Sequence, residues 1–327
     1  MSLPAAMRAW RVEAITEAGD MQRREIAVPV PSPDQYLVAV EAAGLAFGDT
    51  LLVRGKYQVK PPLPFTPGSE IVGRIVGGDG GPLAVGTRIA SSCPHGGFAD
   101  YALCPRNAAW AIGDEVAAGA ALALRSNYAT SLFALRHAAR LRGGETLLVH
   151  AGAGGVGSAA VQLGKLMGAR VLATAGGPDK VRACRAAGAD EAFDYDGQDW
   201  VAEVRRRVPD GIDVVVDPVG GEVGVQSLRC LGFGARYLVI GFAGGSLTAL
   251  PANRLLLHNA SAIGVLWGEV RRRDPGLAAE LTREIYGWHA EGRLQPLVDR
   301  GVDFEQAPAA LAALGGRTSI GKVWLDL

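Results

Sequence analysis

The hydrophobic positions of this chain follow two different patterns, and the change between them lies near residue 125. From Arg8 to about Leu124 the apolar runs are short and bounded by Pro or Gly, as in YLVAVEAAG and EIVGRIVGG. Such runs are typical of short, twisted β-strands. We therefore predict that this part of the chain is mainly β.

After Ala129, strand-like runs, glycine turns and helix-like segments alternate. TLLVHAG precedes SAAVQLGKLMG, and RVLATAGG, IDVVVDPVGG and ARYLVIGFAGG begin the later units. Helical spacing and a glycine at the expected cap, Gly168, predict a helix over residues 158–167. Four such units in a row predict an α/β fold built on a doubly wound parallel sheet.

The segment beyond Trp267 has no place in this series. It holds an amphipathic helix pattern, PGLAAELTREIYGWHAEG, and a final strand pattern, GKVWLDL. We expect both to return to the first domain. The predicted organisation is a cofactor domain over residues 125–265, inserted in a domain formed by residues 1–124 and 266–327.

A glycine-rich sequence follows the first strand of the series. Gly152, Gly154 and Gly157 form G-x-G-x-x-G directly after TLLVH and directly before the predicted helix. A chance turn in a chain with 45 glycines is the alternative reading, but the strand-turn-helix context favours a pyrophosphate-binding loop. We therefore predict a dinucleotide site.

The second strand of the series indicates which dinucleotide binds. Sites for NAD place Asp or Glu at the end of this strand, but here it ends in Thr174, Ala175, Gly176 and Gly177. Lys180 follows and could bind a 2′-phosphate. The sequence favours NADPH, although Lys180 could instead lie on a solvated helix face.

Composition excludes several other functions. Lys plus Arg and Asp plus Glu number 33 each, so no net charge attracts nucleic acid or an anionic membrane. No window has about 20 uninterrupted apolar residues, and the N-terminus lacks targeting patterns, so we expect a cytoplasmic protein. We expect no disulfide among Cys93, Cys104, Cys184 and Cys230.

Other motifs predict no further chemistry. Cys93, His95 and Cys104 are close in sequence, but the Pro and Gly residues between them make convergence on one metal ion improbable. Residues 316–322, GRTSIGK, resemble a phosphate-binding loop, yet Val323 follows where Ser or Thr is required. No GxSxG motif supports a hydrolase.

The stretches LAFGDTLLVRGKYQVKPPLPFTPGSEIVG, GGFADY and LLVHAGAGGVG together resemble the quinone oxidoreductase (zeta-crystallin-like) branch of the medium-chain dehydrogenase/reductase family. Their order and spacing match over nearly the whole chain. The resemblance implies that the first domain is a GroES-like catalytic domain and the second a Rossmann domain. It also implies a zinc-free enzyme, because zinc-dependent relatives carry Cys and His where Ala46 and Ser69 stand here.

The resemblance also implies roles for single residues. Tyr57 would face the substrate cleft and is the one candidate for a catalytic side chain, although it could equally cap a strand. The cleft would be lined by Ala46, Asp49, Leu51 and Tyr57, and it is more apolar than the family pattern, which usually has Asn at residue 46 and often Tyr at residue 51. The cofactor would contact Thr130, Gly152, Ala153, Gly154, Gly155, Val156, Gly157, Gly176, Lys180, Tyr195, Gly241 and Phe242.

The predicted reaction is hydride transfer from NADPH to a quinone or a similar conjugated carbonyl compound, as in an NADPH:quinone reductase. One alternative is an enone or 2-enoyl-thioester reductase, in which Tyr57 would supply a proton. Another is a non-catalytic NADPH-binding protein, crystallin-like or RNA-binding. Family resemblance further implies a homodimer, with residues 263–268 as a plausible edge.

Overall fold

The computed structural model describes residues 3–327; residues 1 and 2, which the domain prediction includes, lie outside the described part. The chain forms two compact units. One comprises the N-terminal part up to Ser126 together with Val298–Leu327, and the other comprises Asn127–Leu297. Each unit is described by itself.

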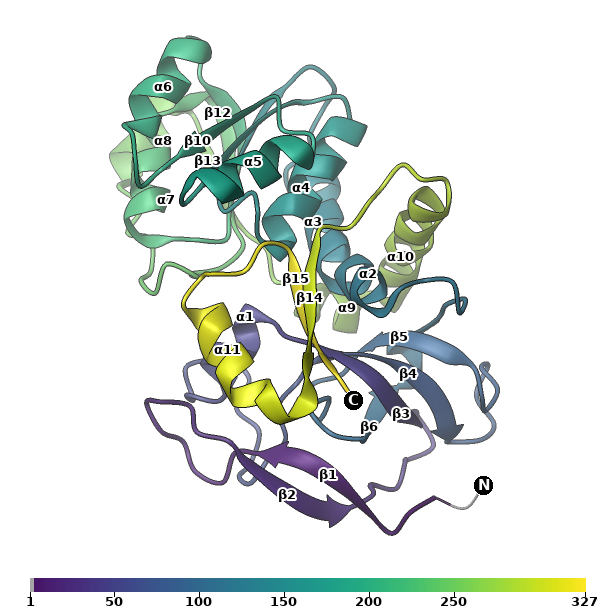
Figure 1. Ribbon diagram of the computed structural model, residues 1–327. Coiled ribbons are helices and arrows are strands. Elements are labelled where there is room, and N and C mark those ends of the chain that lie inside the picture. The colour runs from purple at the N-terminus through teal and green to yellow at the C-terminus, as the bar shows by residue number, and fades with distance from the viewer. Residues whose placement is uncertain (1–2) are drawn as a thin grey trace. The chain divides into compact units, whose positions relative to one another are not determined.

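The first unit is mainly β. Seven strands form one mixed sheet in the order β14-β15-β3-β4-β5-β7, with β6 paired to β3, and β1 pairs with β2 in a separate ribbon (Figure 1). The strands are β1 (Ala6–Arg11), β2 (Gln22–Ala27), β3 (Gln35–Gly44), β4 (Glu70–Gly77), β5 (Arg88–Ser92), β6 (Tyr101–Pro105), β7 (Ala109–Ala111), β14 (Val298–Asp303) and β15 (Lys322–Asp326). The prediction of a mainly β first domain is confirmed.

Few helices accompany these strands. The α-helices are α1 (Phe47–Leu52), α2 (Ala118–Ala123) and α11 (Ala307–Gly315). The core includes Val38 and Ile71 from the sheet and Leu311 from α11, all buried. Strand β15 pairs antiparallel with β3, so the C-terminal end of the chain completes a sheet begun by the N-terminal part.

The second unit is an α/β unit whose six strands are all parallel. Their order is β10-β9-β8-β11-β12-β13, so the chain starts in the middle at β8 and extends first to one side and then to the other. The strands are β8 (Thr146–Val149), β9 (Arg170–Ala175), β10 (Glu191–Asp194), β11 (Ile212–Asp217), β12 (Leu231–Val239) and β13 (Ser261–Gly264). This is the predicted doubly wound parallel sheet.

The pleat of β8 shows why helices cover both faces of this sheet. Leu148 packs into a cluster with Trp200 and Val204 of the α6 side. Its neighbour Leu147 points to the opposite face, as alternation along a strand requires, and lies so close to α4 that a Cβ at Gly164 would be 2.6 Å from it. The helices are α3 (Ala129–Leu132), α4 (Gly155–Leu166), α5 (Pro178–Ala186), α6 (Trp200–Arg207), α7 (Gly221–Ser227), α8 (Ala252–His258), α9 (Trp267–Arg273) and α10 (Pro275–Ala290).

The boundaries of the two units differ in part from the expected ones. The first boundary, Ser126, lies two residues from the expected 124, within the π-helical segment Leu124–Tyr128. Residues 266–297 were expected to belong to the first domain, but α9 and α10 belong to the second unit. Arg136 and Glu284 of α10 form an ion pair there. Only the segment from β14 onward, which includes α11, returns to the first unit.

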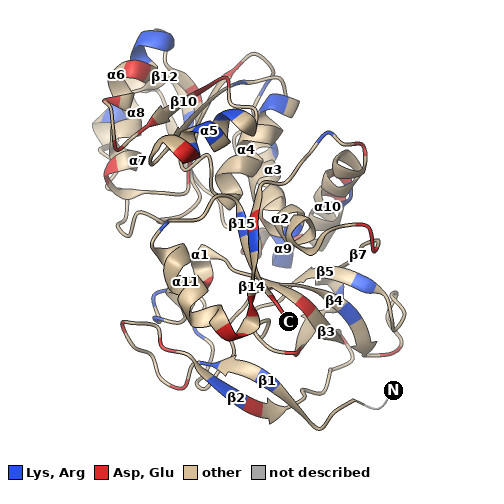
Figure 2. Cartoon of the chain, in the orientation of Figure 1, with Lys and Arg blue, Asp and Glu red and all other residues tan. Residues whose placement is uncertain are grey.

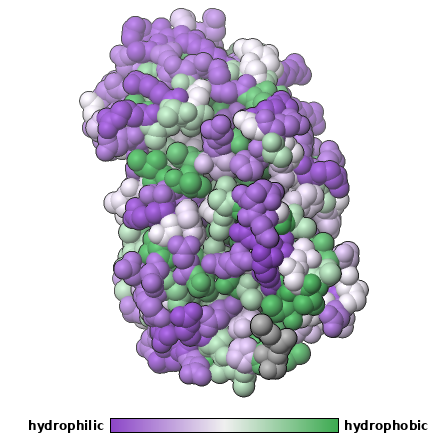
Figure 3. Space-filling view, turned by 45° about the vertical axis from the view of Figure 1, so that its right-hand side comes forward, coloured by the Kyte–Doolittle hydropathy of each residue, from purple (hydrophilic) through white to green (hydrophobic). Residues whose placement is uncertain are grey.

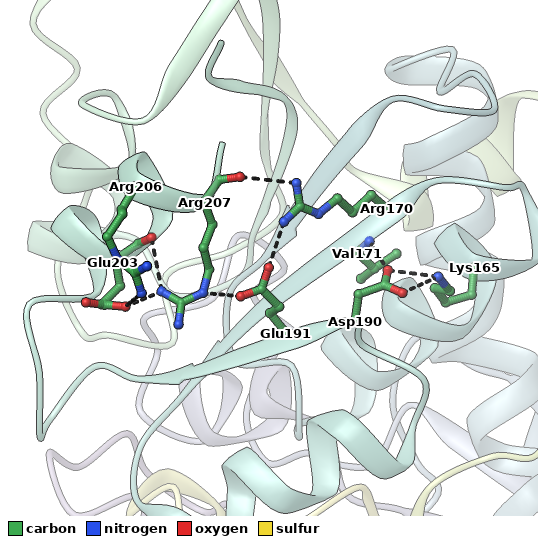
Figure 4. A network of polar contacts seen from close by, with 8 residues as sticks. All are labelled: Lys165, Arg170, Val171, Asp190, Glu191, Glu203, Arg206 and Arg207. Atoms are coloured by element: carbon green, nitrogen blue, oxygen red, sulfur yellow. Dashed lines mark hydrogen bonds and ion pairs between the residues drawn. The ribbon is translucent and has the colours of Figure 1, made fainter. Parts of the chain in front are cut away.

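Basic and acidic residues are both distributed along the chain in each unit (Figure 2). Figure 4 shows one chain of ion pairs along the β9–β10 edge of the second unit, in which Glu191 contacts both Arg170 and Arg207. Nearby, Lys165 contacts Asp190 at 2.7 Å. These groups are partly exposed, so each pair contributes at most about 1 kcal/mol.

Candidate active site

The predicted glycine-rich loop lies at the position where the strand order of the second unit reverses. It follows β8. The next strands in the chain, β9 and β10, lie on one side of β8, and the later strands, from β11 onward, lie on the other side. In open parallel sheets this point leaves a crevice at the carboxyl ends of the strands. The loop ends at Gly154, the N-cap of α4, and the first turn of α4 carries no acidic side chain. Backbone N–H groups at this helix end suit a pyrophosphate.

The glycines of this loop have different steric tasks. A Cβ at Gly152 would lie 2.8 Å from the Cβ of Ala173 in β9, and a Cβ at Gly157 would overlap the carbonyl oxygen of Ala151. A Cβ at Gly155 would overlap the amide of Asn127. Ala151 itself has a φ of 49°, the left-handed region that non-glycine residues seldom adopt. The loop is therefore a tight turn that only glycines at these positions permit.

The end of β9 forms the second corner of this edge. Gly176 and Gly177 follow β9, and Gly177 is the N-cap of α5, with a φ of 83°. Lys180 lies in the first turn of α5. The ring of Tyr195 lies beside Gly176, 3.1 Å from the position that a Cβ there would take. The structure therefore brings Gly176 and Tyr195 together and places Lys180 on the adjoining helix turn.

A carboxylate also reaches this corner, which the order of residues along β9 does not predict. Strand β10 runs parallel to β9, so its carboxyl end lies at the same edge of the sheet. Asp194 accepts hydrogen bonds from Gly177 N at 2.9 Å and from Asp196 N at 3.0 Å. Asp196 Oδ2 lies 2.6 Å from the position of a Cβ at Gly176. As expected, β9 itself ends without a carboxylate. However, Asp194 and Asp196 bring two carboxylates to the turn that follows β9.

The loops after β11 and β12 meet at the same end of the sheet. Ala243 N donates to Pro218 O at 2.9 Å, and Ile240 N donates to Asp217 O at 2.9 Å. Phe242 packs against Gly220, where a Cβ would lie 2.8 Å from its ring. Gly241 and Phe242 therefore lie in the loop that follows β12, against the loop that follows β11. Thr130 lies in α3 of the same unit.

A buried histidine connects three segments of the second unit. His150 directly follows β8 and has no exposed surface. Its Nδ1 lies 2.7 Å from the hydroxyl of Thr174 in β9, and its Nε2 lies 2.6 Å from the hydroxyl of Ser227 in α7. Trp200 packs edge-on against the ring. Burial lowers the pKa of His150, so the ring is neutral at neutral pH.

The first unit holds a buried group of charged side chains around α1. Asp49 accepts a hydrogen bond from Ala46 N at 2.9 Å. Lys322, the first residue of β15, donates to Leu45 O at 3.0 Å and forms an ion pair with Glu70. All three charged side chains are at most 7% exposed. Gly44 permits this packing, because a Cβ there would lie 2.6 Å from Glu70 Oε2.

Burial changes the acidity of Asp49. It raises the pKa of Asp49 to about 7, and the nearby Glu70 charge acts in the same direction. Backbone N–H groups and Lys322 oppose the shift only in part. At neutral pH Asp49 is therefore present in both its protonated and its ionised form.

Tyr57 lies next to Asp49. Its ring covers Gly48, where a Cβ would lie 3.3 Å from the ring, and burial followed by the charge of Asp49 raises its pKa. The phenol is therefore protonated at neutral pH. Ala46 and Leu51 belong to the same α1 segment and are half-buried. The structure thus groups the predicted cleft residues Ala46, Asp49, Leu51 and Tyr57 around α1.

The residues of this group do not fit a zinc ion. Ala46 has no donor atom, and Ser69 stands beside Glu70, which is already paired with Lys322. The thiol of Cys93 contacts Gly68 O, while Cys104 contacts the hydroxyl of Ser91 at 2.7 Å. Within residues 3–327, no three His, Cys, Asp or Glu side chains converge as a metal site.

Three polar features of the site were not predicted from the sequence. His150 follows an apolar run directly before the glycine loop, and this placement of a polar residue is a local signal. Lys322 was noted only as the end of GRTSIGK, and its partner Glu70 is 252 residues away. Asp196 reaches Gly176 only through strand pairing. The last two require the fold to be known.

Known proteins resemble both parts of the chain. Residues 32–162 match the alcohol dehydrogenase GroES-like domain, and residues 155–283 match the zinc-binding dehydrogenase family. Within residues 3–327, no helix combines the length and apolar character that a membrane span requires.

Relatives of similar length extend the match to nearly the whole chain. Quinone oxidoreductase-like protein 2 of Bos taurus is 34% identical over 93% of this chain and 88% of its own, and human quinone oxidoreductase is 31% identical over 93% of each. The crystal structure of the quinone oxidoreductase from Thermus thermophilus, also solved in complex with NADPH, has a TM-score of 0.83 at 32% identity and covers 98% of this chain and 100% of its own. The chain therefore belongs to the quinone oxidoreductase family of medium-chain dehydrogenases/reductases, with a Rossmann unit inserted in a GroES-like unit.

Proposed function

We propose that this protein is an oxidoreductase that uses NADPH to reduce a quinone, and that it needs no zinc. The observation that carries the proposal is the glycine-rich loop at the switch point of the parallel sheet, in a chain that belongs to this family. NADPH would supply a hydride at its nicotinamide. The residues of the chain bind and orient the two reactants.

Each part of the second unit has a role in this proposal. The N-terminus of α4 and the loop Gly152–Gly157 bind the pyrophosphate, with Ala153 and Val156 contributing backbone groups. Lys180, Tyr195 and Gly176 hold the adenosine ribose and its phosphate. Gly241, Phe242 and Thr130 orient the nicotinamide.

Reduction of a quinone places few demands on the side chains of the site. The product of its two-electron reduction is an aromatic diol whose oxygens take protons from water, so the protein need not supply a proton to carbon. Ala46 and Leu51 offer apolar surface for such a ring. The residues around α1 therefore have to position the acceptor.

Reduction of an enone or enoyl thioester is a second candidate, and one observation favours it. Tyr57 is protonated and lies beside Asp49, whose pKa near 7 allows it to hold a proton at neutral pH. Hydride addition to a conjugated alkene leaves a carbanion that must be protonated, and Tyr57 could donate that proton.

A spectrophotometric assay tests both candidates. NADPH absorbance is followed with a naphthoquinone, a benzoquinone, an enone and a crotonyl thioester, with NADH and EDTA in parallel. Quinone-dependent oxidation that is insensitive to EDTA is the expected result. Activity confined to the enone or thioester would replace the first candidate by the second. NADPH binding without turnover of any acceptor would instead indicate a non-catalytic binding protein.

We also propose that the protein is a homodimer in which β13 pairs with β13 of a second copy. β13 is an edge strand with exposed backbone groups. Nearby α8 has no buried residue, and its Leu256 and Leu257 are 80% and 70% exposed. On the face drawn in Figure 3, apolar and polar residues are intermixed. Pairing of two edges would cover both the strand and these leucines.

A further inference from the structure

Three features lie outside the proposed chemistry. A hollow of about 560 Å³ beside Arg205, Arg229 and Phe233 has no buried charged side chain in its lining. The hydrogen bonds of the buried His150 join segments of the second unit and are structural. The third feature is the pair of carboxylates, Asp194 and Asp196, beside Gly176 and Gly177. It supports a further inference because these groups lie where the cofactor is proposed to bind.

We infer that Asp196 determines how strongly this protein discriminates between NADPH and NADH, and that it keeps this discrimination small. The inference rests on the proposed function, since it takes the Gly176 corner as the binding site of the adenosine ribose. It concerns the one chemical difference between the two cofactors, which is a phosphate or a hydroxyl group at the ribose 2′ position.

The backbone holds Asp196 over this corner. Asp194 Oδ1 accepts hydrogen bonds from Gly177 N and Asp196 N, which ties the end of β10 to the turn after β9. As a result Asp196 Oδ2 lies 2.6 Å from where a Cβ of Gly176 would be, on the same side as the ring of Tyr195. The carboxylate therefore occupies the place in which NAD-type sites present an acidic residue to the ribose.

The charges around the corner do not neutralise this carboxylate. Asp196 is exposed, and among residues 3–327 no Lys, Arg or His forms an ion pair with it. Asp194 adds a second negative charge, because its hydrogen bonds from Gly177 and Asp196 hold its pKa below the usual range. Asp179 is paired with Arg182 within α5. Lys180, in the first turn of α5, thus adjoins a corner that carries two carboxylates.

The two cofactors respond differently to such a corner. A 2′-phosphate carries a charge of roughly −1.5 to −2 at neutral pH, so Asp196 repels it and offsets part of the attraction of Lys180. A 2′-hydroxyl is neutral and can donate a hydrogen bond to the same carboxylate. Asp196 therefore weakens NADPH binding and favours NADH binding.

The test measures equilibrium binding instead of turnover. Dissociation constants of NADPH and NADH are determined from nicotinamide fluorescence for the wild type, Asp196→Asn and Asp196→Ala. The matched control is Asp210→Asn, because Asp210 is exposed and precedes β11, at the opposite end of the sheet. Near-ultraviolet circular dichroism checks that each variant is folded.

We expect Asp196→Asn to lower the Kd of NADPH by about 3- to 10-fold and to leave that of NADH within about 2-fold, since each factor of 10 is 1.4 kcal/mol. Asp196→Ala should also raise the Kd of NADH, because it removes the acceptor. The gain in NADPH affinity should shrink as salt rises from 0.05 to about 0.5 M. Asp210→Asn should change neither constant.

Two results would overturn the inference while the proposed function stands. One is an unchanged ratio of the two dissociation constants in both Asp196 variants, and the other is the same shift for both cofactors. By contrast, a wild-type protein that binds neither cofactor would refute the proposed function itself.

Discussion

At the scale of single residues, the first unit buries three ionisable side chains close together. Asp49, Glu70 and Lys322 are buried around α1 and β15, and Glu70 and Lys322 form an ion pair there. Removing one partner of a buried ion pair leaves the other charge uncompensated, which costs far more than the pair contributes. Substitutions in this group should therefore change both the stability of the protein and its pH dependence.

Lys322→Met should lower the free energy of unfolding by about 3 to 5 kcal/mol, because it leaves Glu70 buried without its partner. The double variant Glu70→Gln/Lys322→Met removes both charges and should be more stable than Lys322→Met alone. Urea unfolding at pH 7 measures both. A double variant that is less stable than the single one would show that the ion pair is not the source of the loss.

Asp49 should make the stability of the protein depend on pH. Its pKa is about 7 in the folded state and near 3.8 when unfolded, so between these values the folded state binds more protons and stability falls as pH rises. Asp49→Asn removes this loss. The unfolding free energy of the variant relative to the wild type should therefore increase by roughly 1 to 4 kcal/mol between pH 4 and pH 7.

Urea unfolding of both proteins across this pH range measures the difference. The other ionisable groups cancel in the comparison because both proteins contain them. A difference that stays constant from pH 4 to pH 7 would mean that Asp49 is ionised throughout, and it would remove the support for proton storage beside Tyr57.

At the scale of elements, the same residue type has opposite effects in two helices. Gly157 lies in the first turn of α4, where a Cβ would overlap Ala151 O, whereas Gly287 is an exposed position of α10 with open space around it. In the first case glycine is required by close packing. In the second it only adds conformational freedom to the unfolded chain.

Gly157→Ala should therefore raise the Kd of NADPH by about tenfold or more, because the loop has to move to admit the methyl group. Gly287→Ala should leave this Kd unchanged and stabilise the protein by about 0.5 to 1 kcal/mol. Fluorescence titration and urea unfolding give the two quantities. Equal NADPH affinity of wild type and Gly157→Ala would exclude the α4 loop as the pyrophosphate site.

Elements were predictable from the sequence where their signals are local. The spacing of Ala160 and Leu163 and the cap at Gly168 predict a helix over 158–167, and α4 spans Gly155–Leu166. The membership of α10 was not predictable, because an amphipathic pattern says that one face is buried but not against which unit. The proximity of Asp196 to Gly176 was not predictable either, because it results from the pairing of β10 with β9, which the sequence pattern does not specify.

At the scale of the whole molecule, the proposed homodimer can be tested without reference to activity. Leu256→Lys/Leu257→Lys places charges on α8 next to the β13 edge and should convert the dimer to a monomer. Val85→Lys, an exposed apolar position of the first unit, is the control and should leave the dimer intact. Sedimentation equilibrium measures the mass, and a wild type of 34.0 kDa would refute the proposal.

The hydrogen bonds of His150 have a direction, and it follows from counting protons. The hydroxyl of Ser227 donates its one proton to Val223 O at 2.7 Å, so it can only accept from His150 Nε2. The neutral ring is therefore the Nε2–H tautomer, and Nδ1 must accept from Thr174. Thr174 is two residues from Gly176, and Ser227 ends α7. Thr174, His150, Ser227 and Val223 thus form one row in which each group donates to the next, and the carbonyl oxygen of Val223, which can only accept, fixes its direction.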